Sequence, residues 1–289
     1  MQINWYPGHM TKSIRMMEEN IKLVDAVIYV LDARAPKSCM NPNFDKFIEK
    51  LPVVFVLNKA DLANEESVSK WKKRLSGENR EAVSVNSTIS KTSASVVSLL
   101  KKLCAGKINK FKQKGVKATV RVMIMGVPNT GKSTLTNNLC GKAKAITGNK
   151  AGVTRGKQWV KVSDTIEVMD TPGTLYPKLS DQTVAKHLAF MGSIKDEVVD
   201  GYELALALIE ELVQNHPYAL KNRYGIEVSD APDKLLELIA KKRGFVLRGN
   251  ELDIERASDA VLDDFRKGRM GKITLEEAEE EADNDEESV

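Results

Sequence analysis

The sequence is poor in cysteine and histidine and contains no long apolar run. Its three cysteines, Cys39, Cys104 and Cys140, are far apart and odd in number, which argues against a disulfide framework and against a zinc site. No apolar run is long enough to cross a bilayer and no secretory signal pattern opens the sequence, so we expect a cytoplasmic protein with reduced thiols. Two of the three histidines, His187 and His216, lie in helical patterns without ligand partners. We expect both to be structural or surface residues.

Charge is distributed unevenly along the 289 residues. The formal net charge is +4, but nine acidic residues and no basic one lie between Glu276 and Val289. Residues 1–275 contain the remaining 44 basic and 31 acidic residues, a net charge of +13. A body this basic is suited to a polyanion such as RNA, although a lysine-rich surface that only maintains solubility explains the charge equally well. We expect the acidic end, from about residue 276, to be disordered.

The order of the patterns predicts an α/β protein followed by a helical part. Short apolar runs alternate with helical patterns, which is typical of a doubly wound, mainly parallel sheet that binds ligands at the carboxyl ends of its strands. Helical patterns dominate after residue 178, so we expect a first domain over 1–177 and a smaller all-helical domain over 178–289. The expected strands are 26–31, 53–57, 82–85, 120–125, 159–162 and 166–169, and the expected helices are 12–23, 44–50, 62–76, 93–114, 131–139, 181–190, 202–214, 232–243 and 254–267.

The segment Gly126-Val127-Pro128-Asn129-Thr130-Gly131-Lys132-Ser133 reads G-x-x-x-x-G-K-S between an expected strand and an expected helix. In that context the glycines allow backbone N–H groups to surround phosphate oxygens, and the helix adds its positive N-terminal end. Lys132 should reach the β- and γ-phosphates, and the Ser133 hydroxyl should bind Mg²⁺. We expect Thr130, Gly131 and Thr134 to line the same phosphate site. A glycine-rich turn without a ligand is the alternative, which the complete motif disfavours.

A second motif, Asn58-Lys59-Ala60-Asp61, reads N-K-x-D after an expected strand and predicts the base. The Asp61 carboxylate can accept hydrogen bonds from the ring N–H and the exocyclic amine of guanine, a pattern that adenine does not offer. Asn58 should link this loop to the backbone of the P-loop, the phosphate-binding segment 126–133, and the Lys59 stem should lie along the base. Asn86 and Ser87 follow the next strand, where backbone N–H groups should contact guanine O6. The two motifs together predict a guanine nucleotide.

A third motif, Asp170-Thr171-Pro172-Gly173, reads D-x-P-G at the end of the last expected strand. Asp170 should hold Mg²⁺ through water, and the Gly173 N–H should sense the γ-phosphate. Thr154 in the polar segment 148–157 is the candidate threonine that closes over Mg²⁺, although loop threonines are common. Thr174 stands where many GTPases have a Gln that orients the attacking water.

The base motif precedes the P-loop, whereas most GTPases have the opposite order. A sheet whose ends lie close together can be reconnected and reopened without loss of its site, so this order indicates a circularly permuted domain. The chain then leaves Gly173 directly for the helical part. A movement of the D-x-P-G segment that depends on the γ-phosphate would pull on that part.

The sequence resembles the circularly permuted GTPases, and among them the ribosome biogenesis GTPase A (RbgA/YlqF) family. The resemblance covers essentially the whole chain and rests on the three motifs in this order together with Trp5-Tyr6-Pro7-Gly8-His9-Met10 and Asp32-Ala33-Arg34-Ala35-Pro36. Tyr6 stands where the family usually has Phe. The resemblance implies a GTP-hydrolysing assembly factor for late maturation of the large (50S) ribosomal subunit. It also implies rRNA binding, coupling of the nucleotide state to the subunit, and faster hydrolysis on the subunit.

The resemblance also nominates residues for catalysis beyond Lys132 and Thr154. It suggests His9 as a catalytic residue, since an imidazole can orient water near neutral pH, whereas the sequence alone indicates a solvated loop histidine. It suggests Asn129 as a K⁺ ligand, which would bring positive charge to the phosphates, whereas the alternative is a residue that only shapes the turn. We expect GTP or GDP, Mg²⁺ and K⁺ as cofactors. As partners we expect the large subunit, its rRNA and ribosomal proteins. We expect no binding to membranes or DNA.

For the RNA contact, the basic residues around Lys241, Lys242 and Arg243 are candidates. They could equally lie at a helix C-terminus and interact with its dipole. Two other functions stay open on the residues alone. A nucleotide-gated RNA-binding scaffold would explain the missing Gln, and a small-molecule kinase would also use a P-loop.

Overall fold

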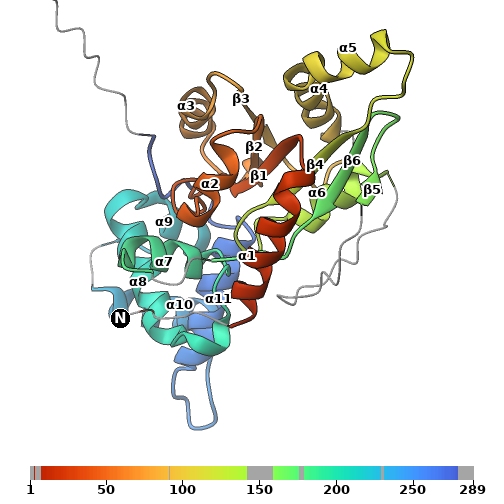
Figure 1. Ribbon diagram of the computed structural model, residues 1–289. Coiled ribbons are helices and arrows are strands. Elements are labelled where there is room, and N and C mark those ends of the chain that lie inside the picture. Colours follow the sequence, from red (N-terminus) through yellow and green to blue (C-terminus); the bar gives the residue numbers. More distant parts are fainter. Residues whose placement is uncertain are drawn as a thin grey trace, which may run out of the picture.

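A six-stranded sheet forms one half of the molecule and a group of helices forms the other (Figure 1). The computed structural model describes residues 3, 8–90, 92–141, 159–175, 179–228 and 231–278. Within them the strand order is β3-β2-β1-β4-β6-β5, and every neighbouring pair is parallel except β5 and β6. This confirms the predicted mainly parallel sheet. The strands are β1 (Ala26–Asp32), β2 (Val53–Asn58), β3 (Arg80–Val85), β4 (Val120–Met125), β5 (Trp159–Lys161) and β6 (Ile166–Asp170).

The register of the central strands brings the predicted motifs to one edge. Asp32 at the end of β1 lies opposite Asn58 at the end of β2, and β4, which leads into the P-loop, pairs with the other side of β1. Every residue of β1 and β2 is buried, as expected for parallel strands covered on both faces. The carboxyl ends of β2, β1 and β4 therefore place the base motif and the P-loop side by side.

Helices cover both faces of the sheet. One apolar cluster lies between the sheet and residues of α4 and α6, including Val96, Leu100 and Leu135. The helices of this half are α1 (His9–Asn20), α2 (Asp45–Ile48), α3 (Glu65–Leu75), α4 (Ser93–Leu103), α5 (Ala105–Gln113) and α6 (Lys132–Leu139), with short 3₁₀ turns at Ile21–Leu23, Pro42–Phe44 and Ala60–Leu62.

Two of these helices differ from the sequence prediction. The single helix expected over 93–114 is broken at Cys104, whose backbone leaves the helical region. Helix α4 packs Val96 and Leu100 on the sheet, whereas α5 has no fully buried residue and contacts the same apolar cluster through the partly buried Ile108. Helix α1 begins at His9 rather than at residue 12, and its N-cap position is Gly8.

The second half consists of helices, which agrees with the predicted helical part. Asp181, Asp200 and Asp253 cap three of them, because each side chain accepts backbone N–H groups of the first turn. Helix α9 was not expected from the sequence because its short apolar pattern spans only two turns. The helices are α7 (Gln182–Phe190), α8 (Gly201–Asn215), α9 (Tyr218–Tyr224), α10 (Pro232–Arg243) and α11 (Ile254–Arg266), with a 3₁₀ turn at Asp196–Val198.

The two halves share one apolar cluster, which runs from Tyr29 and Phe44 on the sheet side to Phe190 and Phe265 on the helical side. None of the helices in the described ranges has the length and apolar character needed to span a bilayer. The division at residue 177 stays a prediction, because the cluster continues across it.

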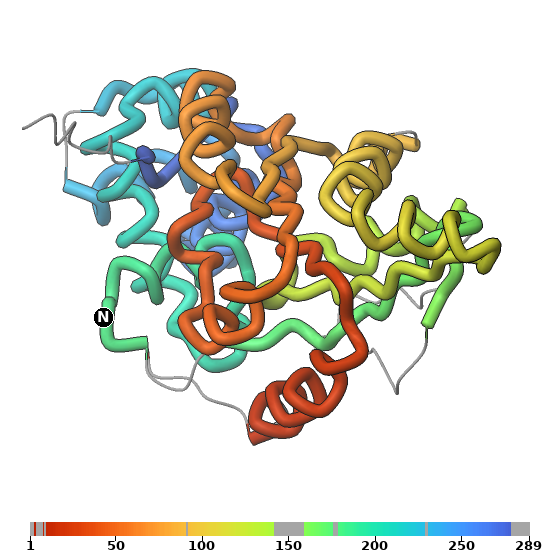
Figure 2. The backbone as a smooth tube through the Cα atoms, turned by 45° about the horizontal axis from the view of Figure 1, so that its top comes forward, coloured from red at the N-terminus to blue at the C-terminus, as the bar shows by residue number. Residues whose placement is uncertain are grey.

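The segment after α11 returns to the sheet half (Figure 2). Its backbone donates from Ile273 N to Leu62 O over 3.0 Å and from Leu275 N to Arg34 O over 2.7 Å. The first two acidic residues of the run accept hydrogen bonds, Glu276 from Ser38 and His187 and Glu277 from Ser67. The disorder expected from about residue 276 stays a prediction.

Candidate functional site

The P-loop connects β4 to α6 and depends on its two motif glycines. Gly126 has φ of 152°, and a Cβ there would collide with the carbonyl oxygen of Val30 at the end of β1. Gly131 has φ of 91°, and a Cβ there would collide with the side-chain amide of Asn58. Glycine is required at both positions because φ is positive there and the loop packs directly against the carboxyl-terminal parts of β1 and β2.

Asn58 joins the P-loop to the two base loops. Its Nδ2 donates to Thr130 O over 2.7 Å, and its Oδ1 accepts from the backbone N–H of Ser87 over 3.0 Å. This is the link to the P-loop backbone that the sequence predicted. No sequence motif marks Asn138 on α6, whose Nδ2 donates to the carbonyl oxygens of Ser87 and Ile89 over 3.0 and 2.7 Å.

The base side of the site is open. Asp61 lies in the 3₁₀ turn Ala60–Leu62 and is exposed, so its carboxylate is accessible to a ligand. Asn86 accepts from the backbone N–H and the hydroxyl of Thr88 over 2.9 and 2.6 Å. Its side chain thus shapes the turn, which presents backbone rather than side-chain groups.

Lys59 extends over the P-loop instead of into solvent. It has a left-handed φ of 57°, and its Nζ donates to Asn129 O over 2.8 Å and pairs with Asp32 Oδ2 at 2.9 Å. The side chain of Lys59, whose stem was expected to lie along a base, is therefore held between the P-loop and the end of β1.

Asp32 and Arg34 form a buried ion pair behind Lys59. The Arg34 Nη2 lies 2.8 Å from Asp32 Oδ2, and both side chains are almost completely buried. Burial acts to raise the pKa of Asp32, but Arg34 and Lys59 outweigh it and hold that pKa below its ordinary range. Arg34 also donates to the carbonyl oxygen of Phe265 over 3.1 Å, at the end of α11. The segment that contains Asp32 and Arg34 was noted in the sequence only as part of the family resemblance, and no role was predicted for it.

The phosphate side contains a buried lysine. Lys132 is 6% exposed and donates from Nζ to Val127 O over 2.7 Å. Burial lowers the pKa of Lys132 from 10.5 to about 8, although the nearby Asp170 carboxylate acts in the opposite direction. Thr130 is buried and Thr134 is half-buried in the same region.

Ser133 and Asp170 lie together at the start of α6 and the end of β6. The Ser133 hydroxyl donates to Asp170 Oδ2 over 3.0 Å. The other oxygen, Oδ1, is buried and has no hydrogen-bond partner among the described residues, and burial raises the pKa of Asp170. A buried carboxylate oxygen beside a hydroxyl is an incomplete set of oxygen ligands, which suits Mg²⁺. The sequence predicted this pair.

The D-x-P-G segment packs on the P-loop. A Cβ at Gly173 would lie 2.7 Å from Pro128 Cα and 2.9 Å from Lys132 Nζ, so the backbone at Gly173 passes close to the lysine. Thr174 is completely buried, and Asn41 donates to its carbonyl oxygen over 3.1 Å. The residue at the usual Gln position therefore does not face a solvent-filled site.

The structure does not describe the side chains of Thr154 and His9, two of the predicted catalytic residues. Thr154 and the aromatic pair before Pro7 lie outside the described residues, and so does the side chain of His9. The backbone of His9 begins α1, and the neighbouring Met10 is buried with its Sδ 3.3 Å from the backbone N–H of Leu175. The first turn of α1 is therefore attached just after the D-x-P-G segment.

The P-loop also contacts the helical half. Asn129 has a left-handed φ of 60°, and its Nδ2 donates to Gly192 O. The next residue, Ser193, donates from Oγ to Pro128 O over 2.7 Å. No pattern in the sequence indicates this contact, because the two segments are more than sixty residues apart.

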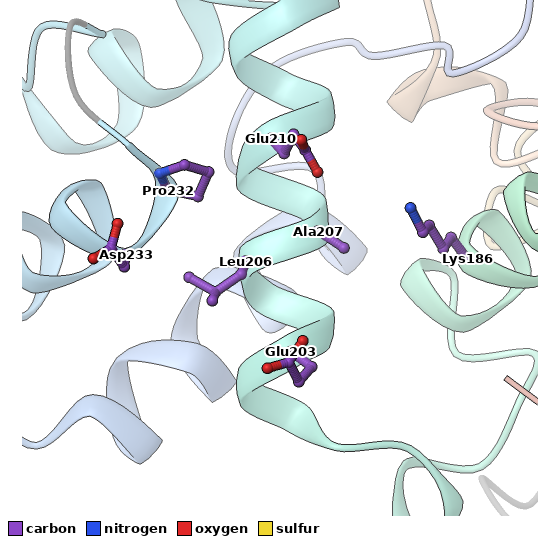
Figure 3. Close-up of a pocket in the computed structure, with 7 residues that line it drawn as sticks. All are labelled: Lys186, Glu203, Leu206, Ala207, Glu210, Pro232 and Asp233. Carbon is purple, nitrogen blue, oxygen red and sulfur yellow. The ribbon is translucent and has the colours of Figure 1, made fainter. Parts of the chain in front are cut away.

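Two cavities in the helical half have the wrong chemistry for a phosphate ligand. One of about 320 Å³ lies around α8, with Glu203, Glu210 and Asp233 against a single Lys186 (Figure 3). A larger one of about 740 Å³ between α8 and α11 is lined by five carboxylate side chains and one arginine. Carboxylates repel phosphate, so the P-loop is the better nucleotide site.

The comparisons with known proteins agree with the motifs. A family model described as 50S ribosome-binding GTPase matches residues 121–242. Ribosome biogenesis GTPase A of Bacillus cereus is 38% identical over 97% of this chain and 95% of that protein, and the protein of the same name from Thermotoga maritima is 31% identical over 96% of this chain and 95% of that protein.

Solved structures agree as well. GNP-bound YlqF from T. maritima superimposes with a TM-score of 0.67 at 26% identity, over 92% of this chain and 98% of that one. A GDP-bound YlqF structure gives the same TM-score at 25% identity, over 91% of this chain and 99% of that one.

Proposed function

Because the chain belongs to the ribosome biogenesis GTPase A family, and is thus a GTPase, we propose that it hydrolyses GTP during late maturation of the large ribosomal subunit. In this proposal it binds the rRNA of that subunit in the cytoplasm and couples its nucleotide state to subunit binding. The observation that carries the proposal is the joining of base motif and P-loop by Asn58, in a chain whose residues 1–275 have a net charge of +13.

The chain's own groups divide the work on the nucleotide. Asp61 would select guanine, and Asn58 would hold the base loop at a fixed distance from the P-loop. Lys132 would leave Val127 O and bind the β- and γ-phosphates. Gly173 would present its N–H to the γ-phosphate, which its closeness to Lys132 Nζ supports.

Mg²⁺ and K⁺ are the proposed ions. Ser133 and Asp170 would hold Mg²⁺, with Thr154 as a further ligand, and Asn129 would hold K⁺. The donor sets fit, since Asp170 presents a buried oxygen without a partner among the described residues and Asn129 keeps its carbonyl oxygen when its amide nitrogen binds Gly192. Both ions would supply positive charge that stabilises the negative charge of the reacting phosphate groups.

His9 is proposed to orient the attacking water in place of the missing Gln. Two observations support this role. Thr174 is buried and does not point into an open site, and the contact of Met10 with Leu175 keeps the first turn of α1 beside the D-x-P-G segment. His9→Ala should spare GTP binding and lower subunit-stimulated hydrolysis.

The RNA-binding surface is proposed to lie at the end of α10, in the domain over 178–289. Lys241, Lys242 and Arg243 are exposed there, and the guanidinium groups of Arg243 and Arg256 lie 5.7 and 4.6 Å from the ring centre of Phe245. Stacked guanidinium groups keep their N–H donors available for phosphate. Gly244 ends the helix, so the same three residues also interact with its dipole.

The test is multiple-turnover GTP hydrolysis with and without purified large subunits, in KCl and in NaCl of equal ionic strength. We expect slow hydrolysis alone, stimulation by the subunits and a higher rate in KCl. If subunits bind but do not stimulate hydrolysis in either salt, the chain is a nucleotide-gated RNA-binding scaffold instead.

A further inference from the structure

The turn Met191–Ile194, which follows α7, holds the P-loop at two points. Its Gly192 carbonyl oxygen accepts from Asn129 Nδ2, and its Ser193 hydroxyl donates to Pro128 O over 2.7 Å. Ser193 is buried, so its hydroxyl is shielded from competing water. The helical half thus contacts the P-loop at the two residues just before Thr130.

This turn is itself braced from α11. Arg266 donates from Nε to Phe190 O over 3.0 Å and from Nη2 to Ala189 O over 2.9 Å, and its guanidinium pairs with Asp196. The carbonyl groups that it binds lie at the end of α7, where helical carbonyls lack intrahelical partners. Arg266 therefore fixes the end from which Gly192 and Ser193 project.

The hydrogen bond to Gly192 fixes the orientation of the Asn129 side-chain amide. Only the nitrogen can donate to a carbonyl oxygen, so Nδ2 is used and Oδ1 becomes the electron-pair donor that the side chain offers elsewhere. Without Gly192 O, rotation of the amide by half a turn would cost little and would present a donor nitrogen instead. A cation binds the oxygen and is repelled by the N–H₂ group.

We propose that Gly192, Ser193 and Arg266 are positioning residues that orient the P-loop Asn129 so that its Oδ1 faces a monovalent cation at the phosphates. The helical half would in this way supply part of the GTPase site. This inference rests on the proposed role of K⁺ and adds residues from a segment more than sixty positions away in sequence.

The test uses full-length Ser193→Ala and Arg266→Met. Ser258→Ala and Arg269→Met are the matched controls, because Ser258 is a buried serine bonded within α11 and Arg269 is an ion-paired arginine close to Arg266. A fluorescent, non-hydrolysable GTP analogue is titrated in KCl and in NaCl at equal ionic strength. The K⁺ concentration for half-maximal hydrolysis and the thermal midpoint are measured alongside.

For the wild type and the controls we expect tighter binding of the analogue in KCl than in NaCl. In both test variants the KCl affinity should fall by a factor of about 3–10, which corresponds to one hydrogen bond, while the NaCl affinity stays within a factor of about two. The half-maximal K⁺ concentration should rise in parallel.

The inference is overturned if a folded Ser193→Ala or Arg266→Met protein has the same ratio of analogue affinity in KCl to that in NaCl as the wild type. The turn is then only a packing contact. A wild-type protein that treats K⁺ and Na⁺ alike refutes the K⁺ part of the proposed function, and the inference with it, while stimulation by subunits in NaCl would leave the assembly role intact.

Discussion

The side-chain amide of Asn58 donates to the carbonyl oxygen of Thr130 over 2.7 Å, so the loop of the N-K-x-D motif is bonded directly to the P-loop. The other end of the same amide accepts from Ser87 N. A nucleotide has a fixed distance between its base and its phosphates, and one asparagine keeps that distance constant in the protein.

Replacement of Asn58 by Ala should therefore weaken GDP and GTP binding by a factor of about 10 or more. The change leaves two buried backbone groups without partners, at a cost of about 1–3 kcal/mol each. Titration with a fluorescent GDP analogue measures the loss. Asn64→Ala is the control, since Asn64 caps α3 and its loss should lower stability by about 1 kcal/mol without affecting nucleotide affinity. Equal nucleotide affinity of wild type and Asn58→Ala would contradict the role.

Lys132→Met should raise the stability of the nucleotide-free protein while it abolishes nucleotide binding. Burial lowers the pKa of Lys132 to about 8, so below pH 8 the folded state keeps a charge that burial disfavours. Loss of that charge should add about 1–3 kcal/mol at pH 7. Denaturant unfolding of both proteins measures the difference.

Because the pKa of Lys132 is lowered, the difference in unfolding free energy between the wild type and Lys132→Met should depend on pH. Between about pH 8 and pH 10 the unfolded wild type binds more protons than the folded one, because the ordinary pKa is 10.5. The unfolding free energy of the wild type therefore rises relative to that of the variant over this range. The stability advantage of Lys132→Met over the wild type becomes smaller. GTP affinity of the wild type should fall above pH 8, because binding then requires uptake of a proton. A gap that widens would show that Lys132 is not the titrating group.

The sequence predicted the sheet and the three motifs because each depends on local chemistry. The buried strands appear as apolar runs, and the positive φ at Gly126 and Gly131 is a property of the backbone of a single loop. The ends of these strands meet because parallel strands bring their carboxyl ends to one edge. Such features need no knowledge of which distant segments come into contact.

What the sequence could not predict depends on contacts between distant segments. Nothing in the pattern around Ser193 marks its hydrogen bond to Pro128, and nothing in the acidic run from Glu276 marks its first carboxylate as a partner of Ser38 and His187. The charge of that run argues against burial, but a single glutamate surrounded by donors can still be fixed.

Asp170→Asn should separate nucleotide binding from the effect of Mg²⁺. The carboxylate has one oxygen on Ser133 and one buried oxygen without a partner in the described ranges, so it is suited to hold the ion rather than the nucleotide. GDP affinity in EDTA should stay within a factor of about three of wild type, and the gain on adding Mg²⁺ should disappear. Isothermal titration with and without EDTA tests this, and an unchanged gain would exclude Asp170 as a ligand.

Asp61→Asn should change the preferred base from guanine to xanthine. The exposed Asp61 carboxylate would accept from the two N–H groups of guanine, whereas an amide can donate to the additional carbonyl oxygen of xanthine. Competition by GTP, XTP and ATP against a labelled nucleotide measures the change, with a loss of GTP affinity by a factor of about 100 or more. A wild-type protein that prefers ATP would refute the base assignment and would support the kinase alternative.

The surface at the end of α10 should contribute to binding through its positive charges on phosphate groups. Alanine at Lys241, Lys242 and Arg243 together should weaken binding to large subunits and lower the slope of log K against log salt by about 0.7–0.9 for each phosphate that the variant no longer neutralises. The control is alanine at Lys110, Lys112 and Lys114, three exposed lysines in or just after α5 in the sheet half, which removes the same charge. Sedimentation with subunits over a range of KCl concentrations measures both.

The comparison of the two triple variants separates three explanations. A lower slope for the α10 variant alone supports a defined RNA surface there. Equal losses of affinity in the two variants would show that binding follows total charge, as it does for nonspecific binding to a polyanion. A lower thermal midpoint without a change in binding would mean that the three residues serve only the helix, since positive side chains near Gly244 also stabilise the C-terminal end of α10 through its dipole.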